Sequence, residues 1–232
     1  MTSEAGNTRP LVIVTGAGRG LGAILARRLA PEYTIWTVNR SPDTCDTPLP
    51  NRVFHGDLRT PAPARYLAEQ CRINLIVPHG VIHCPGPIAY SREPVPEWPV
   101  WQDMADGNVA GAVHLLRELA PIMRNGRWVL FGFSGIGTER GFRQIAAYAA
   151  AKESLAVLAR TAARWLAPSG TTVNVIAPGI FADIDGRIPE PGRRLLDRIP
   201  LGRFGGDDDI TGPVRWLLAP GSGYITGQMI KV

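Results

Sequence analysis

The chain has 232 residues, which is enough to bury one sizeable core, and its net charge is +5. Its basic residues are scattered, with no Lys/Arg block and no alternation with aromatic residues, so the charge does not indicate nucleic-acid binding. No apolar stretch approaches the ~20 residues of a membrane span, and the N-terminal residues contain no signal-peptide core. Three unpatterned cysteines fit a reducing compartment. We therefore expect a cytoplasmic protein without nucleic-acid or membrane partners.

The first predicted elements are a strand and a helix joined by a glycine-rich turn. The run LVIVT at 11–15 is typical of a strand that is buried on both faces, as in a parallel sheet. Glycines at 16, 20 and 22 then lead into an amphipathic helix, predicted from Ala23 to Ala30. Because glycine allows tight turning and close backbone approach, a pyrophosphate can sit on the N-terminus of this helix. The pattern predicts a dinucleotide site.

A second strand, predicted over Tyr33–Val38, ends in Asn39 and Arg40. An NAD site usually has an Asp or Glu there, which holds the two ribose hydroxyls. This chain has a neutral side chain and a cation instead, and Arg19 lies in the glycine-rich turn. Two arginines near a ribose suit a 2′-phosphate through charge-assisted bonds, although both also fit the pattern of ordinary surface arginines. The pattern favours NADP(H) as the cofactor.

Three residues farther along have a spacing that suggests metal binding. His79, His83 and Cys84 fit one turn of a helix, but the segment follows a strand and is followed by prolines. A fourth ligand is not apparent nearby. We therefore predict no metal site, and expect His79 to line the cofactor groove or to pack locally.

Tyr148 and Lys152 lie four residues apart in an alanine-rich helical stretch. This spacing puts both side chains on one face of the helix. A fixed ammonium favours tyrosinate and lowers a tyrosine pKa from ~10, so the pair makes a proton donor and acceptor near neutral pH. The alternative is an ordinary amphipathic surface. Because lysine occurs only at 152 and 231, Lys152 is less typical of a casual surface residue.

Taken in order, these motifs resemble the short-chain dehydrogenase/reductase family over nearly the whole chain. The resemblance implies one domain over residues 1–232, an α/β Rossmann fold with a doubly wound parallel sheet of about seven strands and helices on both faces. The matching segments are TGAGRGLG at 15–22, Gly56-Asp57-Leu58, Asn108 in DGNVAG, Ser134 after a strand at Trp128–Phe133, YAAAK at 148–152, NVIAPG at 174–179, IPLGRFG at 199–205 and YITGQ at 224–228.

The resemblance also implies catalytic roles. Tyr148 would be the general acid that protonates a carbonyl oxygen while hydride arrives from the nicotinamide, and Lys152 would lower its pKa and hold the nicotinamide ribose. Ser134 would hydrogen-bond the substrate oxygen, and Asn108 would anchor a water that links Lys152 to solvent. The cofactor-binding residues implied in this way are Thr15, Gly16, Gly18, Arg19, Gly20, Leu21, Gly22, Asn39, Arg40, Asp57, Leu58, Gly80, Tyr148, Lys152, Pro178, Gly179 and Ile180.

Two departures from the family pattern are visible. The family's Asn-Asn-Ala-Gly after the fourth strand is expected here at Val77-Pro78-His79-Gly80, where only the glycine matches. Ser134 lies one position farther from Tyr148 than is usual in relatives.

Substrate contacts are expected from a loop at about 180–204, whose glycines and prolines are typical of lids. The first hypothesis is an NADPH-dependent reductase of a small carbonyl (ketone) substrate. The alternatives are a pteridine or imine reductase, or an NADP(H)-binding protein without turnover that serves in regulation or assembly. The family resemblance further implies a homodimer or homotetramer.

Overall fold

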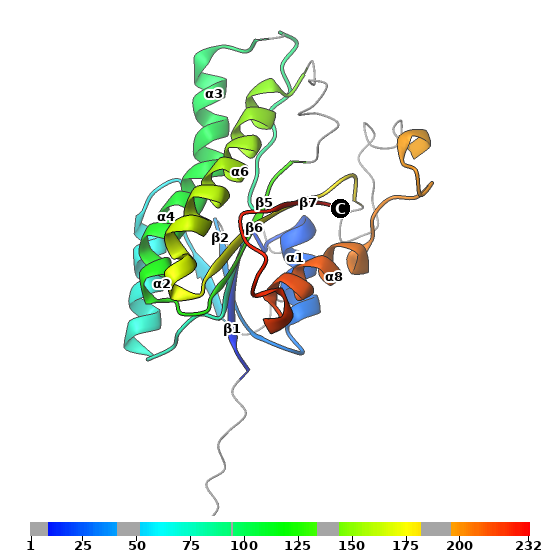
Figure 1. The fold of residues 1–232 in the computed structure, drawn as a ribbon. Helices are drawn as coiled ribbons and strands as arrows, with labels where there is room; N and C mark the ends of the chain where they lie inside the picture. Colours follow the sequence, from blue (N-terminus) through cyan, green and yellow to red (C-terminus); the bar gives the residue numbers. More distant parts are fainter. Residues whose placement is uncertain (1–8, 41–51, 94, 134–143, 182–195) are drawn as a thin grey trace, which may run out of the picture.

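The computed structural model of the chain describes residues 9–40, 52–93, 95–133, 144–181 and 196–232. These residues form a seven-stranded parallel sheet in the order β3-β2-β1-β4-β5-β6-β7 (Figure 1). Its strands are β1 (Leu11–Thr15), β2 (Thr34–Asn39), β3 (Arg52–His55), β4 (Gly80–His83), β5 (Arg127–Phe131), β6 (Thr172–Ala177) and β7 (Met229–Lys231). The order of the strands reverses between β1 and β4, so the sheet is doubly wound, and the predicted α/β Rossmann fold is confirmed.

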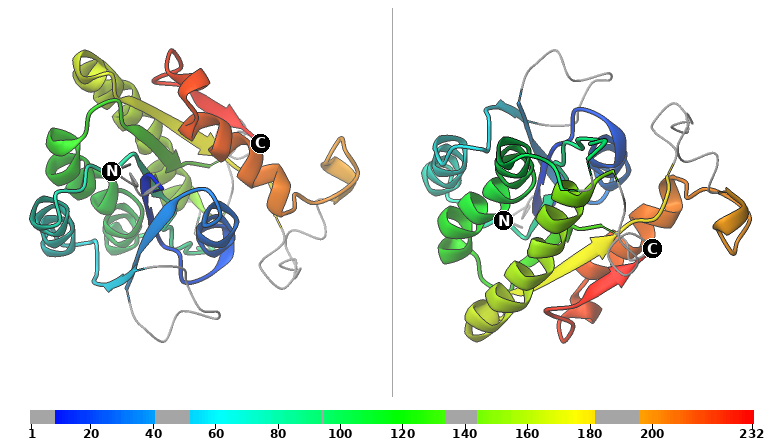
Figure 2. Two further views of the ribbon diagram at one scale, coloured as in Figure 1. Left: turned by 90° about the horizontal axis from the view of Figure 1, so that it is seen from below. Right: turned by 90° about the horizontal axis from the view of Figure 1, so that it is seen from above.

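Helices cover both faces of the sheet (Figures 1 and 2). One layer contains α1 (Gly20–Leu29) and α8 (Asp207–Leu218), and the other contains α2 (Ala62–Ile73), α4 (Gly111–Leu119) and α6 (Ala146–Leu166). A further helix, α3 (Trp98–Ala105), packs against α6 and continues into α4 through a π-helical turn at Asp106–Ala110, called the π-turn below. Among the described residues, no helix has the length and apolar character needed to cross a membrane.

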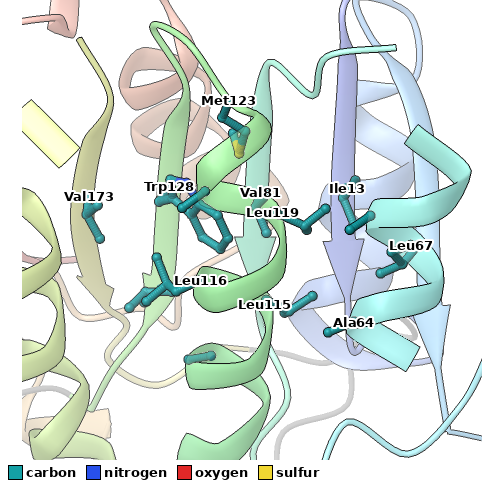
Figure 3. Packing of buried hydrophobic residues seen from close by; sticks show 14 of the residues in the cluster. Ile13, Ala64, Leu67, Val81, Leu115, Leu116, Leu119, Met123, Trp128 and Val173 are labelled. Atoms are coloured by element: carbon teal, nitrogen blue, oxygen red, sulfur yellow. The ribbon is translucent and has the colours of Figure 1, made fainter. Parts of the chain in front are cut away.

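The strand residues alternate between the two helical layers, as the pleat of a β-strand requires. Ile13 of β1 packs on the α2/α4/α6 side, whereas Val12 and Val14 pack on the α1/α8 side. Figure 3 shows Ile13, Val81 and other strand side chains meeting leucines of α2 and α4. Burying one such aliphatic side chain stabilises the fold by ~1.5–3 kcal/mol, so these two cores fix the sheet between its helices.

The ends of several elements differ from their predicted bounds. Helix α1 begins at Gly20 and not at Ala23, and α8 includes Asp207 and Asp209 in its first turn. The Asp209 carboxylate accepts a hydrogen bond from the Gly206 backbone N–H at 2.8 Å, so it caps the N-terminus of this helix. Helix ends depend on such capping contacts, which hydrophobic periodicity does not report.

The predicted position of the fourth strand is wrong. Strand β4 begins at Gly80, which pairs with Val12 and Arg127 at the amino ends of the neighbouring strands. The apolar run before it forms an exposed connection, in which Leu75 is 92% exposed and has a positive φ of 53°. The segment at the carboxyl end of the fourth strand is therefore His83-Cys84-Pro85-Gly86, and not Val77–Gly80.

Candidate active site

A cavity of about 360 Å³ lies at the carboxyl ends of the central strands, where the strand order reverses. Ligands of open α/β sheets bind at this position. We call this cavity the groove. Its lining includes ten of the residues predicted to bind the cofactor, namely Gly16, Gly18, Arg19, Gly20, Leu21, Gly22, Asn39, Arg40, Asp57 and Leu58. The structure brings these residues together, while their binding of a cofactor stays a prediction.

The glycine-rich turn has the geometry that a bound anion needs. Gly16 and Gly20 have positive φ values of 70° and 56°, and a Cβ on Gly22 would collide with the Gly16 carbonyl oxygen. Helix α1 starts after Arg19 without a side-chain cap and without an acidic residue in its first turn. Its N-terminal N–H groups and the positive end of its dipole therefore face the groove.

Gly80 is not at the groove, so its predicted cofactor contact is corrected. It lies at the amino end of β4, where a Cβ would stand 2.6 Å from Leu218. Gly86 lines the groove in its place. The error follows from the misplaced fourth strand, because the carboxyl ends of parallel strands define the binding edge.

His83 joins two of the strands that end at the groove. Its Nδ1 lies 2.8 Å from the Thr15 hydroxyl, and both residues are buried. Burial lowers the pKa of His83 to about 3, with a smaller contribution from the Lys152 charge, so the ring is neutral at physiological pH. Thr15 thus supports the groove from below rather than lining it.

The other two residues of the suggested metal cluster, His79 and Cys84, have surroundings that differ from each other. His79 packs locally: its Nε2 lies 2.8 Å from the Leu218 carbonyl oxygen, and its ring stacks on Tyr33. Cys84 lines the groove, and burial raises the pKa of its thiol to about 12. Within the described ranges, no group of three or more His, Cys, Asp or Glu side chains is placed to hold a metal ion.

Lys152, on α6, does not line the groove but lies directly behind two residues that do, Phe131 and Pro85. Its Nζ donates hydrogen bonds to the backbone carbonyls of Phe131 at 2.9 Å and Pro85 at 3.0 Å. The side chain is buried, and this burial lowers the pKa of its ammonium to about 8. At pH 7 the group is therefore mostly charged and is fixed by the ends of two adjacent strands.

Asn108 occupies the π-turn and is fully buried. Its Nδ2 donates to the Met104 carbonyl at 2.9 Å and to the Pro87 carbonyl at 3.1 Å, while its Oδ1 has no hydrogen-bond partner among the described residues. A Cβ on Gly86 would stand 2.8 Å from this Oδ1 and 2.7 Å from the Lys152 Nζ. The absence of a side chain at Gly86 therefore keeps open a space that Asn108 and Lys152 share.

Tyr148 lies one helical turn before Lys152, as predicted, with the Phe133 ring edge-on at 5.3 Å. The pKa of Tyr148 is shifted in the opposite direction to the prediction, which expected Lys152 to lower it. Burial raises the pKa of Tyr148 to about 12, with a smaller effect from Tyr90, and Lys152 is not among the causes. The ammonium is instead engaged by two carbonyls, so the phenol holds its proton at neutral pH.

Some predicted site residues lie elsewhere. Ser134 falls outside the described residues, as does most of the expected substrate loop. Pro178 and Gly179 follow β6 at the carboxyl edge of the sheet, and Ile180 accepts a hydrogen bond from the Gly205 backbone at 3.0 Å. These three residues do not line the groove, and neither do Tyr148 and Lys152. Sequence reasoning also missed Arg59 and Asp106, which do.

The chain is similar to known oxidoreductases over nearly its full length. A family model described as Enoyl-(acyl carrier protein) reductase matches residues 16–232. The 3-oxoacyl-(acyl-carrier-protein) reductase of Staphylococcus epidermidis is 29% identical over 238 residues, which cover 95% of this chain and 96% of the relative. The short-chain reductase protein NovJ of Streptomyces niveus is 30% identical over 259 residues, with coverage of 100% and 95%.

A solved structure has a similar fold. The blue fluorescent protein from a metagenomic library, in complex with NADPH, superposes with a TM-score of 0.86 and 25% identity, covering 97% of this chain and 96% of that one. This superposition agrees with the seven-stranded fold of the chain. The chain therefore belongs to the short-chain dehydrogenase/reductase family of oxidoreductases.

Proposed function

We propose that the protein is an NADPH-dependent reductase that transfers hydride to the carbonyl carbon of a small ketone, with Tyr148 as the general acid. The observation that carries this proposal is the buried Lys152 ammonium, held by the Phe131 and Pro85 carbonyls behind the groove lining, one helical turn from a protonated phenol. A carbonyl that becomes an alkoxide needs a proton donor and positive charge where the negative charge develops. A phenol that keeps its proton at neutral pH is in the form that reduction requires.

Substrate chemistry is inferred from the relatives and from the apolar surroundings of Tyr148. One relative is a 3-oxoacyl-(acyl-carrier-protein) reductase, whose name describes a ketone-bearing substrate. The Phe133 ring against Tyr148 provides an apolar wall beside the phenol. We assign the hydrogen bond to the substrate oxygen to Ser134, and the remaining substrate contacts to the loop at about 180–204.

The residues of the groove fit NADP(H). The glycine-rich turn and the α1 N-terminus suit the pyrophosphate, Asp57 and Leu58 suit the adenine, and Tyr148 and Lys152 suit the nicotinamide ribose. Strand β2 ends in Asn39 and not in an acid, and both Arg19 and Arg40 are exposed at the groove, where a 2′-phosphate would meet them. When bound, the cofactor supplies the hydride. The solved relative contains NADPH, which supports the same choice here.

Replacing Arg40 with alanine is expected to weaken NADPH binding about tenfold and to leave NADH binding nearly unchanged. The reason is the loss of one charge-assisted hydrogen bond to a phosphate group that NADH lacks. Titration of both cofactors by their fluorescence measures the two dissociation constants. Arg117→Ala, which removes an exposed arginine on α4 away from the groove, serves as the control. Equal affinities of the unmodified protein for NADPH and NADH would contradict the assignment.

The proposed activity is tested by measuring NADPH oxidation against a panel of ketones that also contains a pteridine and a cyclic imine. Turnover with ketones is the expected result. Reduction of only the pteridine or the imine would overturn the substrate class. Tight NADPH binding without turnover of any compound would instead identify an NADP(H)-binding protein without catalysis.

We also infer a homodimer or homotetramer, assembled through the helices around Asn108 and Tyr148. The outer face of α6 supports this inference, because Val157 is 56% and Trp165 is 83% exposed there. Large apolar side chains on one helix face are typical of a surface that another subunit covers.

A further inference from the structure

The π-turn that carries Asn108 is an irregular segment between α3 and α4. A π-helical turn inserts one extra residue into a helix, has poorer hydrogen-bond geometry, and persists where surrounding contacts hold it. If the extra residue were absorbed into a regular helix, the side chains on one side of the turn would rotate by ~100° relative to the other side. The position of Asn108 therefore depends on what holds the π-turn.

Arg59 contacts this region at three points. Its Nη1 forms an ion pair with the Asp103 carboxylate at 2.9 Å, one turn before Asn108. Its backbone carbonyl accepts a hydrogen bond from the His114 Nε2 at 3.3 Å, after the π-turn. Its Nη2 lies over Gly107, where a Cβ would stand 3.4 Å away. One residue thus contacts the helix before, within and after the irregular turn.

The other contacts of the π-turn with its surroundings are one side-chain hydrogen bond, from the Asn108 Nδ2 to the Pro87 carbonyl at 3.1 Å, and a set of steric contacts. Pro87 packs on Gly107, and Leu58 and His83 pack on Gly111. Such steric contacts limit how closely the segments approach, but they provide no directional bond that fixes the helix rotation. The Asp103 ion pair and the His114 hydrogen bond are directional, so they select one rotation.

Arg59 is itself held in place. Its backbone N–H donates to the Asp57 carboxylate at 3.0 Å, which closes the turn after β3. The same turn lines the groove through Asp57, Leu58 and Arg59. The wall of the groove and the helix segment that presents Asn108 therefore form one connected unit.

We propose that Arg59 and Asp103 are positioning residues, which lock the π-turn in the register that holds Asn108 beside Lys152. The two Asn108 donor bonds, to Met104 and Pro87, then leave its Oδ1 at the space beside Gly86, which the Lys152 Nζ also faces. The catalytic consequence rests on the proposed reductase function. The inference that Arg59 and Asp103 hold the π-turn does not rest on that function, because it concerns only the conformation of the helix.

The variant Asp103→Ala tests the proposal, because Asp103 does not line the groove and Arg59 stays in place. Its matched control is Glu118→Ala, which breaks the Arg65–Glu118 ion pair of 3.3 Å on α4 without touching the π-turn. Both changes put alanine at a helical position. Because aspartate is a weaker helix former than glutamate, Asp103→Ala gains more helix propensity than the control, so faster exchange in Asp103→Ala cannot come from a loss of propensity. Backbone hydrogen exchange over residues 104–111 is compared for the two variants and the unmodified protein.

We expect exchange over this segment to be about two- to fivefold faster in Asp103→Ala, the size of effect that a partly exposed ion pair gives, and unchanged in Glu118→Ala. At saturating NADPH and ketone, kcat should fall by a similar factor in Asp103→Ala, with an unchanged Kd for NADPH. The kcat of the double variant Arg59→Gln/Asp103→Ala should be no lower than that of the slower of the two single variants, because both changes remove the same ion pair.

The proposal is overturned if exchange is unchanged in Asp103→Ala, or if it rises equally in the Glu118→Ala control. It is also overturned if exchange rises while kcat stays constant, because the lock would then have no effect on Asn108. If the unmodified protein reduces no carbonyl compound, the proposed function fails, and the exchange comparison still decides whether Arg59 and Asp103 hold the π-turn.

Discussion

Tyr148→Phe is expected to lower the rate of NADPH-dependent ketone reduction by about 10²–10⁴-fold, the usual contribution of a positioned general acid. The change removes only the hydroxyl, so the ring keeps its edge-on contact with Phe133 and the helix is undisturbed. NADPH binding should therefore change little. Initial rates of NADPH oxidation and a fluorescence titration of NADPH measure the two effects separately.

The control for this prediction is Tyr66→Phe, which makes the same chemical change at a half-exposed tyrosine on α2, outside the groove. Its rate should equal that of the unmodified protein. A Tyr148→Phe variant that reduces ketones at the full rate would remove Tyr148 from its role as acid.

Lys152→Met is expected to lower the reduction rate by about 10²–10³-fold, because it removes a preorganised positive donor held against the groove lining. Methionine has a similar length and suits an apolar environment, so the helix is expected to form. The measurement is the rate of NADPH oxidation at saturating substrate. The control is Lys231→Met, which changes the other lysine of the chain, at the exposed end of β7. Equal rates in the two variants would contradict a catalytic role for Lys152.

The same variant makes a prediction about stability against pH. The pKa of Lys152 is about 8 in the folded protein, against 10.5 for an ordinary lysine, so the unfolded chain binds more protons between these values. The unfavourable burial of the charge is therefore fully present below pH 8 and is relieved as the pH rises toward ~10.4. The free energy of unfolding of the unmodified protein should rise over this window relative to that of Lys152→Met. Thermal unfolding at a series of pH values measures this difference, and a constant difference would contradict the lowered pKa.

The sequence predicted the first strand and the long helix of the fold well, because the residue types of both segments are typical of those elements. Strand β1 was predicted over its observed residues, since a β-branched run followed by glycines is rarely anything but a buried strand. Helix α6 was predicted from its alanine-rich composition, and Tyr148 and Lys152 lie one turn apart on it, as the spacing requires. The fourth strand was misplaced because the apolar residues before Gly80 resemble a strand, while the observed strand has only four residues.

The pKa shift of Tyr148 could not be predicted from its spacing to Lys152 in the sequence. An i,i+4 interval shows that two side chains share a helix face, but it does not show where a long ammonium chain ends. Lys152 ends on two carbonyls supplied by segments that are distant in sequence, and burial then dominates the pKa of Tyr148. Arg59 was missed for a related reason, because its three contacts exist only once β3 and the α3–α4 segment lie side by side.

The space beside Gly86 sets which substitutions are tolerated in the four residues that begin at the end of β4. These residues, His83 to Gly86, differ from the family's Asn-Asn-Ala-Gly at three positions and match it at the fourth. The matching position is the one where any side chain would wedge Asn108 away from Lys152. The first position carries an imidazole, whose Nδ1 lies 2.8 Å from the Thr15 hydroxyl. The volume at Gly86, which no side chain can occupy without displacing Asn108 or Lys152, is thus the constraint that the structure places on this short segment.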